Sequence, residues 1–293
     1  MSDIYVKTED KSCLAPGLSS DFITPLIRIM NITEAIRIRK SVRNYSGMPL
    51  TAPQQSALQQ SIDSAINPFG GKAAVRLKKF DLNGPFKPST YGTIRNATHY
   101  LLMSAGNDLT DALSAGYVME QTILAATALG LGTCWIAATF RGTDFDKGKQ
   151  WPEGQTLKAI SPVGKAAEKE TLRGKITKLI AGSSKRKPFE SLFFLEKAST
   201  PLPMDNRYAE ALEMMRLAPS SVNSQPWRAI VTGATVHFYS TSSKYLSMID
   251  CGIGLCHFYL SEKEAGEKGR FYNDNSHPAA DGLTYIISWQ PQP

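Results

Sequence analysis

The sequence contains few cysteines and no long apolar run, and these absences exclude several classes of protein. Only four cysteines occur in 293 residues, and none belongs to a CxxC pair or a zinc-like cluster. We therefore expect reduced thiols and an intracellular chain, not a disulfide scaffold. No stretch of ~18 apolar residues is present, so we expect no membrane span. The first ten residues lack an apolar signal core, which makes the cytoplasm the expected compartment.

Groupings typical of metal centres are also missing. The histidines show no HxxxH spacing, and we expect structural roles for all four: His99, His237, His257 and His277. Asp144 and Asp146 form a DxD pair, but no other type of ligand stands beside them. The sequence therefore predicts no metal site.

The chain carries a modest excess of positive charge. Lys and Arg number 33 against 26 Asp and Glu, which gives a net charge of +7. Such a field favours anionic ligands. A nucleic-acid interface is usually denser and carries a binding motif, so we expect no nucleic acid and favour a phosphate-bearing small molecule.

The pattern of apolar residues predicts a mixed α+β chain with an internal repeat. After an extended arm at 1–30, the expected helices are 32–43, 52–66, 111–130, 206–217 and 246–265. The expected strands are 74–82, 99–103, 157–163, 227–232, 235–240 and 283–289. The order helix, turn, strand, long helix, loop, strand occurs twice, which favours two diverged copies at 31–195 and 196–293.

Four segments carry residues suited to binding a flat, phosphorylated ligand. Residues 39–43 (RKSVR) offer guanidinium groups and a hydroxyl, which suit a phosphate. Residues 185–188 (KRKP) form a second basic cluster. Residues 130–138 place small residues and Trp135 after a long helix, where a backbone can approach a ligand closely. Residues 218–227 (APSSVNSQPW) are the most specific string, since a packing loop would seldom use so many hydrogen-bonding side chains.

Together these segments resemble the nitroreductase family of enzymes that use flavin mononucleotide (FMN). The resemblance rests on an RxS segment at 39–41, a GLGxxW segment at 130–135, a strand ending in PxG at 162–164, a KRxP segment at 185–188 and a PSSxNxQPW loop at 219–227. It covers roughly residues 31–290. It implies an α/β/α sandwich with mixed or antiparallel sheets.

The order of the motifs departs from an ordinary member of the family. The PSSxNxQPW loop should follow the RxS segment closely, but residues 66–72 stand in that place and lack its Ser, Gln and Trp. The intact loop occurs only in the second copy, which has no RxS helix of its own. Family members are normally homodimers in which both protomers hold each flavin. This chain is similar to a fused, diverged dimer of the tandem nitroreductase-like subfamily, so we expect a monomeric pseudo-dimer.

The resemblance implies a role for each candidate residue. Arg39, Ser41 and Arg186, with Lys185 second, would bind the FMN phosphate. Arg43, one helical turn beyond Arg39, would lie near flavin N1 and O2, and Lys40 would touch the ring. The remaining expected cofactor contacts are Trp135, Ile136, Ala137, Ala138, Pro219, Ser220, Ser221, Asn223 and Gln225. Backbone N–H groups of residues 136–138 would face flavin N5, so no catalytic side chain is expected.

The resemblance implies an oxidoreductase with a ping-pong reaction. NADH or NADPH would give hydride to the flavin, which would pass it to a nitroaromatic, a quinone or a similar small acceptor. The alternative is a degenerate flavin-binding or structural descendant of the same fold. The sequence leaves both the acceptor and the choice of NADH or NADPH open.

Overall fold

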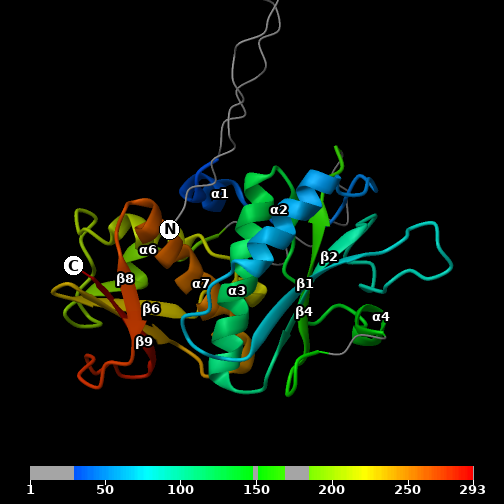
Figure 1. Cartoon of the computed structure of the whole chain (residues 1–293). Coiled ribbons are helices and arrows are strands. Elements are labelled where there is room, and N and C mark those ends of the chain that lie inside the picture. The colour runs from blue at the N-terminus through cyan, green and yellow to red at the C-terminus, as the bar shows by residue number, and fades with distance from the viewer. Residues whose placement is uncertain (1–29, 148–150, 169–184, 293) are drawn as a thin grey trace, which may run out of the picture.

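The protein is described by a computed structural model that covers residues 30–147, 151–168 and 185–292. Its described residues form two β-sheets with helices between them (Figure 1). Residues 1–29 of the expected arm lie outside the described residues, and so does most of the basic stretch that precedes Lys185.

The first half of the chain builds a four-stranded sheet and its covering helices. Thr51 and Gln54 form a capping box that starts the second helix, because each side chain bonds the other residue's backbone N–H. The elements of this half are α1 (Ile32–Ile38), α2 (Ala52–Asp63), β1 (Ala73–Lys79), β2 (His99–Ala105), α3 (Leu109–Ala128), β3 (Gly132–Thr133), α4 (Gly142–Asp146) and β4 (Thr156–Gly164).

The second half builds a five-stranded sheet around a second long helix. The predicted strands 227–232 and 235–240 are confirmed, and Gly233 and Ala234 connect them as a hairpin. The elements of this half are η1 (Phe189–Ser191), β5 (Phe193–Leu195), α6 (Ala209–Arg216), η2 (Ser221–Asn223), β6 (Trp227–Thr232), β7 (Thr235–Ser240), α7 (Tyr245–Glu264), β8 (Gly269–Tyr272) and β9 (Thr284–Pro291).

The two sheets share one strand order. The first runs β1-β2-β4-β3, and the second runs β6-β7-β9-β8 once β5 is set aside. Both sets of four pair antiparallel throughout. β5 is the exception, because it joins the second sheet parallel to β6. The predicted α+β class with antiparallel and mixed sheets is therefore confirmed.

Helices α3 and α7 cross at the centre of the molecule, between the sheets (Figure 1). Each helix has 20 residues, and the eighth residue of each is a glycine, Gly116 or Gly252. A Cβ at Gly116 would lie 2.0 Å from the carbonyl oxygen of Ile249, and one at Gly252 would lie 2.0 Å from that of Leu113. Only glycine permits so close an approach of two backbones. Leu113 and Ile249 are each the fifth residue of their helix, so the crossing has twofold symmetry.

One continuous hydrophobic core spans both halves. It includes Leu101 and Ile123 from the first half and Leu212, Trp227 and Phe258 from the second. A smaller cluster around Tyr100 and Phe145 covers the outer face of the first sheet. No helix in the described ranges is long and apolar enough to span a membrane.

The predicted helix 32–43 is wrong in its second part. The helix ends at Ile38, and Arg39 caps it with an extended ψ of 127°. Ser41 then forms an isolated parallel bridge with Thr133, so this segment is extended. The N–H of Val42 donates to the carbonyl oxygen of Thr133 at 2.8 Å, and this tertiary contact overrides local helix propensity.

Candidate functional site

A cavity of about 420 Å³ lies where segments from both halves meet. Every expected site residue lines it except Lys185 and Gln225. The lining residues are Arg39, Lys40, Ser41, Arg43, Trp135, Ile136, Ala137, Ala138, Thr139, Arg186, Pro219, Ser220, Ser221, Val222, Asn223, Leu246, Ile249, Asp250 and Ile253. The sequence therefore identified segments that fold to one place although they are far apart in the chain.

The extended segment 39–43 forms one wall of the cavity. The segment is extended at Ser41, and Arg39, Lys40, Ser41 and Arg43 all line the cavity. The expectation that Arg43 lies one helical turn beyond Arg39 is therefore wrong, although both residues line the cavity. The segment packs tightly on β3, since a Cβ at Gly132 would lie 2.6 Å from a methyl carbon of Val42. A glycine at this position lets the arginine-bearing wall approach the sheet.

Positive charge is concentrated at this wall. Burial and the adjacent guanidinium groups of Arg39 and Arg216 lower the pKa of Arg186 to about 10. The Nε atoms of Arg39 and Arg43 are buried and have no hydrogen-bond partner among the residues that the structure describes. A guanidinium group with a buried, unused donor normally faces an anionic partner. This wall therefore fits a phosphate or another anion.

The loop from Pro219 to Gln225 supplies a second wall of the cavity through its residues 219–223. Val222, Asn223 and Gln225 have positive φ angles of 45°, 56° and 49°. For the β-branched Val222 this is a strained conformation. Its side chain is also 86% exposed, although it lines the cavity. Such strain persists only where the surroundings hold the loop in place.

The basic segment 185–187 holds this loop. Arg186 Nη1 donates to Asn223 Oδ1 at 2.9 Å, and Asn223 Nδ2 donates to the Lys185 carbonyl oxygen at 2.6 Å. The buried Gln225 accepts a 2.8 Å hydrogen bond from the N–H of Lys187 through Oε1. Lys185 and Gln225 thus join the loop to the basic segment and do not line the cavity.

Helix α7 supplies the wall that the sequence analysis missed. Leu246, Ile249, Asp250 and Ile253 line the cavity at the spacing i, i+3, i+4 and i+7, which is one face of a helix. The N–H of Ser221 donates to the two oxygens of Asp250 at 3.0 and 3.1 Å, and Ser224 Oγ donates to Oδ2 at 3.3 Å. The lone acid Asp250 among apolar neighbours is the one unusual feature of this face in the sequence, and by itself it did not identify a wall of the cavity.

The backbone after Trp135 corrects one expected role. The N–H of Ile136 donates to the carbonyl oxygen of Ile160 at 2.9 Å within a β-bridge. It is therefore engaged and is not the donor expected to face a bound ring. That expectation now applies to Ala137 and Ala138 alone.

The corresponding place in the second half is filled with aromatic side chains. Phe271 follows the end of α7 by the same number of residues as Trp135 follows the end of α3. Its ring lies 5.2 Å from that of Phe69, which belongs to the segment 66–72, and 6.2 Å from that of Tyr117. Phe69 and Tyr117 are themselves 5.2 Å apart. This place has aromatic packing where the cavity has hydroxyls and guanidinium groups.

The segment 66–72 nevertheless hydrogen-bonds to helix α3 in the way that the Ser-rich loop, residues 219–225, hydrogen-bonds to helix α7. The N–H of Gly71 donates to Ser114 Oγ at 3.1 Å. Ser114 is the sixth residue of α3, and Asp250, which accepts from Ser221, is the sixth residue of α7. The two loops therefore occupy equivalent positions on the two helices.

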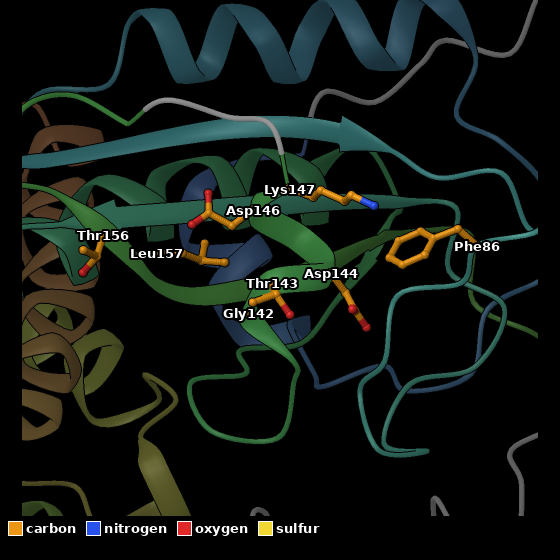
Figure 2. Close-up of a pocket in the computed structure, with 8 residues that line it drawn as sticks. All are labelled: Phe86, Gly142, Thr143, Asp144, Asp146, Lys147, Thr156 and Leu157. Atoms are coloured by element: carbon orange, nitrogen blue, oxygen red, sulfur yellow. The ribbon is translucent and has the colours of Figure 1, made fainter.

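A second, more open hollow of about 670 Å³ lies beside α4, between Phe86 and the start of β4 (Figure 2). The acidic side chains of this hollow already have hydrogen-bond partners nearby. Asp144 accepts a 2.8 Å hydrogen bond from the N–H of Ser89, and Asp146 accepts one from the Trp151 indole. Figure 2 shows Lys147 and Asp144 pointing in different directions. These side chains do not converge on a common point. No group of three metal-ligating side chains occurs in the described part of the chain.

Comparisons with known proteins agree with the fold and assign the family. A family model described as "Putative TM nitroreductase" matches residues 31–262, and the chain belongs to this family. A solved structure of that description, from Thermotoga maritima, has a TM-score of 0.60 and 23% identity. The match covers 93% of this chain and 98% of that one.

Other solved nitroreductases match about half of the chain. One from Bacteroides fragilis with bound FMN has a TM-score of 0.37 and 19% identity over 48% of this chain and 91% of that one. One from Desulfovibrio desulfuricans in complex with FMN has a TM-score of 0.37 and 19% identity over 48% of this chain and 92% of that one. No curated protein matches the chain.

Proposed function

We propose that this chain is an FMN-dependent oxidoreductase that passes hydride from NADH or NADPH to a small acceptor such as a nitroaromatic or a quinone. The single observation that carries the proposal is the cavity itself. It brings together the guanidinium groups of Arg39, Arg43 and Arg186, the Ser-rich loop and the segment after Trp135. Membership of the nitroreductase-like family supports the same reaction class.

The residues present fit FMN. A phosphate is an anion, and it would satisfy the buried Nε atom of Arg39 and relieve the repulsion between Arg39 and Arg186. Ser41 and the loop hydroxyls add donors and acceptors suited to a ribityl chain and a pyrimidine edge. Ile249 and Ile253 supply an apolar surface for a ring.

When bound, the cofactor supplies hydride transfer at its N5 atom. Arg39, Ser41 and Arg186 bind and orient the phosphate, and Arg43 holds positive charge in the same wall. Such a charge favours an anionic ring and therefore a reduced flavin. Ala137 and Ala138 present backbone N–H groups from the opposite element. The exposed Val222 and Leu246 lie at the edge of the cavity, where a planar acceptor has apolar contacts.

A duplication within the chain, which we propose, would explain why one site suffices. The same strand order in both sheets, and the symmetric crossing of α3 and α7, support two diverged copies with a boundary near residue 195. The first copy provides the arginines and Trp135, and the second provides the Ser-rich loop. We infer one FMN per chain in a monomer, because aromatic rings fill the equivalent place.

The alternative is a descendant that binds flavin or keeps the fold without catalysis. Loss of a flavin site within this chain is consistent with the place around Phe69 and Phe271, where aromatic rings stand and the donors of a flavin site are missing. The retention of the complete donor set in the other cavity favours the enzyme.

The visible absorption spectrum of the purified protein tests the proposal. The enzyme is expected to show the bands of bound oxidised flavin and to lose them on anaerobic addition of NADH or NADPH. Arg39→Ala, which removes a proposed phosphate ligand, should yield protein with less flavin. Flavin that neither nucleotide bleaches would support the descendant without catalysis. Protein that binds no FMN would contradict the proposed enzyme and would leave only a descendant that keeps the fold.

A further inference from the structure

Asp250 is an acid in a cavity otherwise rich in cations. Of the described residues that line the cavity, it alone carries a carboxyl group. It is the sixth residue of α7 and only 5% exposed, and the cavity-lining Ile249 and Ile253 flank it on the same helix. Neither phosphate binding by the arginine-bearing wall, residues 39–43, nor the proposed hydride transfer requires an acid at this position.

The contacts of Asp250 leave it free to exchange a proton. It accepts hydrogen bonds from the Ser221 N–H and from Ser224 Oγ, and no ion pair among the described residues includes it. Burial raises the pKa of Asp250 to about 7, although these two hydrogen bonds oppose the shift. Ser221 and Ser224 are exposed, so the carboxyl group is one hydrogen bond from bulk water. The Cys251 thiol on α7 interacts with Asp250 and also with Arg228 on β6, and the cations that line the same cavity are Arg39, Lys40, Arg43 and Arg186.

We propose that Asp250 is the general acid that protonates the acceptor during its reduction. This inference rests on the proposed function. Reduction of a quinone by hydride adds two electrons and one proton and produces a hydroquinone monoanion. The carboxyl O–H bond of Asp250 then breaks, a hydroquinone O–H bond forms, and a carboxylate remains. Water returns a proton to the carboxylate by way of Ser224. The electrons come from NADH or NADPH, so the step is balanced.

The chemistry of Asp250 suits this role. A general acid works best when its pKa lies near the working pH, because it is then both protonated and able to release the proton. An ordinary aspartic acid would be almost fully ionised at neutral pH. A guanidinium group does not give up a proton at neutral pH, so an arginine cannot replace Asp250 as the acid.

Asp250→Asn tests the proposal, because the amide keeps a hydrogen-bond acceptor for Ser221 but cannot give up a proton in this way. Glu262→Gln is the matched control. Glu262 lies on the same helix, is 5% exposed, has a pKa raised to about 7 by burial and does not line the cavity. Rates are compared with 1,4-benzoquinone, which needs a proton, and with ferricyanide, which takes electrons alone.

We expect Asp250→Asn to lower the benzoquinone rate about 100-fold, the scale of general acid catalysis. Any change in the ferricyanide rate, in bleaching by NADPH or in FMN affinity should be much smaller than this loss, and Glu262→Gln should change none of the four. In the unaltered chain, the ratio of benzoquinone to ferricyanide rates should fall as the pH rises through about 7. An infrared pH titration of flavin-free protein should show a carboxylic acid band that Asp250→Asn removes and Glu262→Gln leaves in place.

Three results would overturn the inference while leaving the proposed function intact. These are equal losses with both acceptors, a loss of FMN affinity that accounts for the loss of rate, and a rate ratio that is independent of pH in the unaltered chain. The first two would mean that Asp250 only positions the loop. If the unaltered chain binds no FMN, or NADPH does not bleach it, the proposed function fails and the inference fails with it.

Discussion

The indole nitrogen of Trp135 donates a 2.6 Å hydrogen bond to Glu120 Oε2, and this bond ties the wall of the cavity to the centre of the fold. The other oxygen of Glu120 lies 2.9 Å from His257 Nε2, and His257 Nδ1 lies 3.0 Å from the Met214 carbonyl oxygen. Since a carbonyl only accepts, Nδ1 carries a proton, and one further proton lies between Glu120 and Nε2. The fully buried pair thus joins α3 of one half to α7 of the other.

Replacing Glu120 by Ala should lower the free energy of unfolding by ~3–5 kcal/mol, because it leaves His257 buried without its partner. Glu120→Gln, which keeps an oxygen acceptor for Trp135, should cost less. Urea unfolding monitored by circular dichroism measures both variants. Equal losses for the two would show that the carboxylate itself is needed, and that neither the side-chain volume nor an acceptor for Trp135 is enough.

Removal of either phosphate-binding arginine should weaken FMN binding about 10–100-fold, as expected for a charge-assisted hydrogen bond. The variants are Arg39→Ala and Arg186→Ala, and calorimetric titration of flavin-free protein gives the dissociation constants. Arg37→Ala is the control, since Arg37 is exposed and pairs with Glu210 outside the cavity. Similar weakening at Arg37 would mean that the cations act as a general field.

Flavin content should equal one FMN per chain, and the protein in solution should have the mass of a monomer. The donors lie in one cavity, and Phe69, Tyr117 and Phe271 fill its counterpart. Ser220→Ala with Asn223→Ala should weaken the same site that Arg39→Ala weakens. Flavin released on denaturation, divided by protein, gives the ratio. Two flavins per chain, or binding only in a dimer, would contradict the fused-dimer interpretation.

Substitution at the helix crossing should destabilise the whole chain. Gly116→Ala or Gly252→Ala places a methyl group 2.0 Å from a backbone carbonyl oxygen, so the two helices must move apart. We expect a loss of ~1–3 kcal/mol for each, the usual cost of overpacking. Gly254→Ala, on the same helix, should cost less, because the nearest atom is the terminal carbon of the Met215 side chain at 3.1 Å, which can move. Thermal unfolding distinguishes the three variants, and an equal effect at Gly254 would contradict the argument.

Stability should fall as the pH rises from about 4.5 to about 7, in part because of Glu262. Burial raises the pKa of Glu262 from 4.5 to about 7, while nearby Arg207 opposes this shift. Between these values the folded chain binds more protons than the unfolded chain, so the free energy of unfolding decreases with pH, by at most ~1.4 kcal/mol per pH unit for this group. Glu262→Gln should flatten this part of the stability profile, measured by urea unfolding at several pH values. A profile that is unchanged in the variant would show that Glu262 does not titrate there.

The sequence by itself determined the elements and the motifs. Regular apolar patterns and turn residues were enough to predict strands 227–232 and 235–240, and the long helices were predicted to within a few residues of α3 and α7. The donor-rich motifs at 39–43, 185–188 and 219–227 have compositions that packing alone does not explain. The sequence was therefore enough to identify the segments that carry the hydrogen-bond donors and the positive charge.

Only the tertiary structure decided where these elements meet. Residues 39–43 are extended because Thr133 pairs with them, which no local pattern reveals. The three residues of β5 and the two of β3 are too short to show a period. Helix α7 is apolar on most sides, so its sequence did not indicate that the face with Ile249 and Asp250 would line a cavity. That choice depends on the close crossing at Gly116 and Gly252, where contacts between residues distant in sequence fix the rotation of each helix.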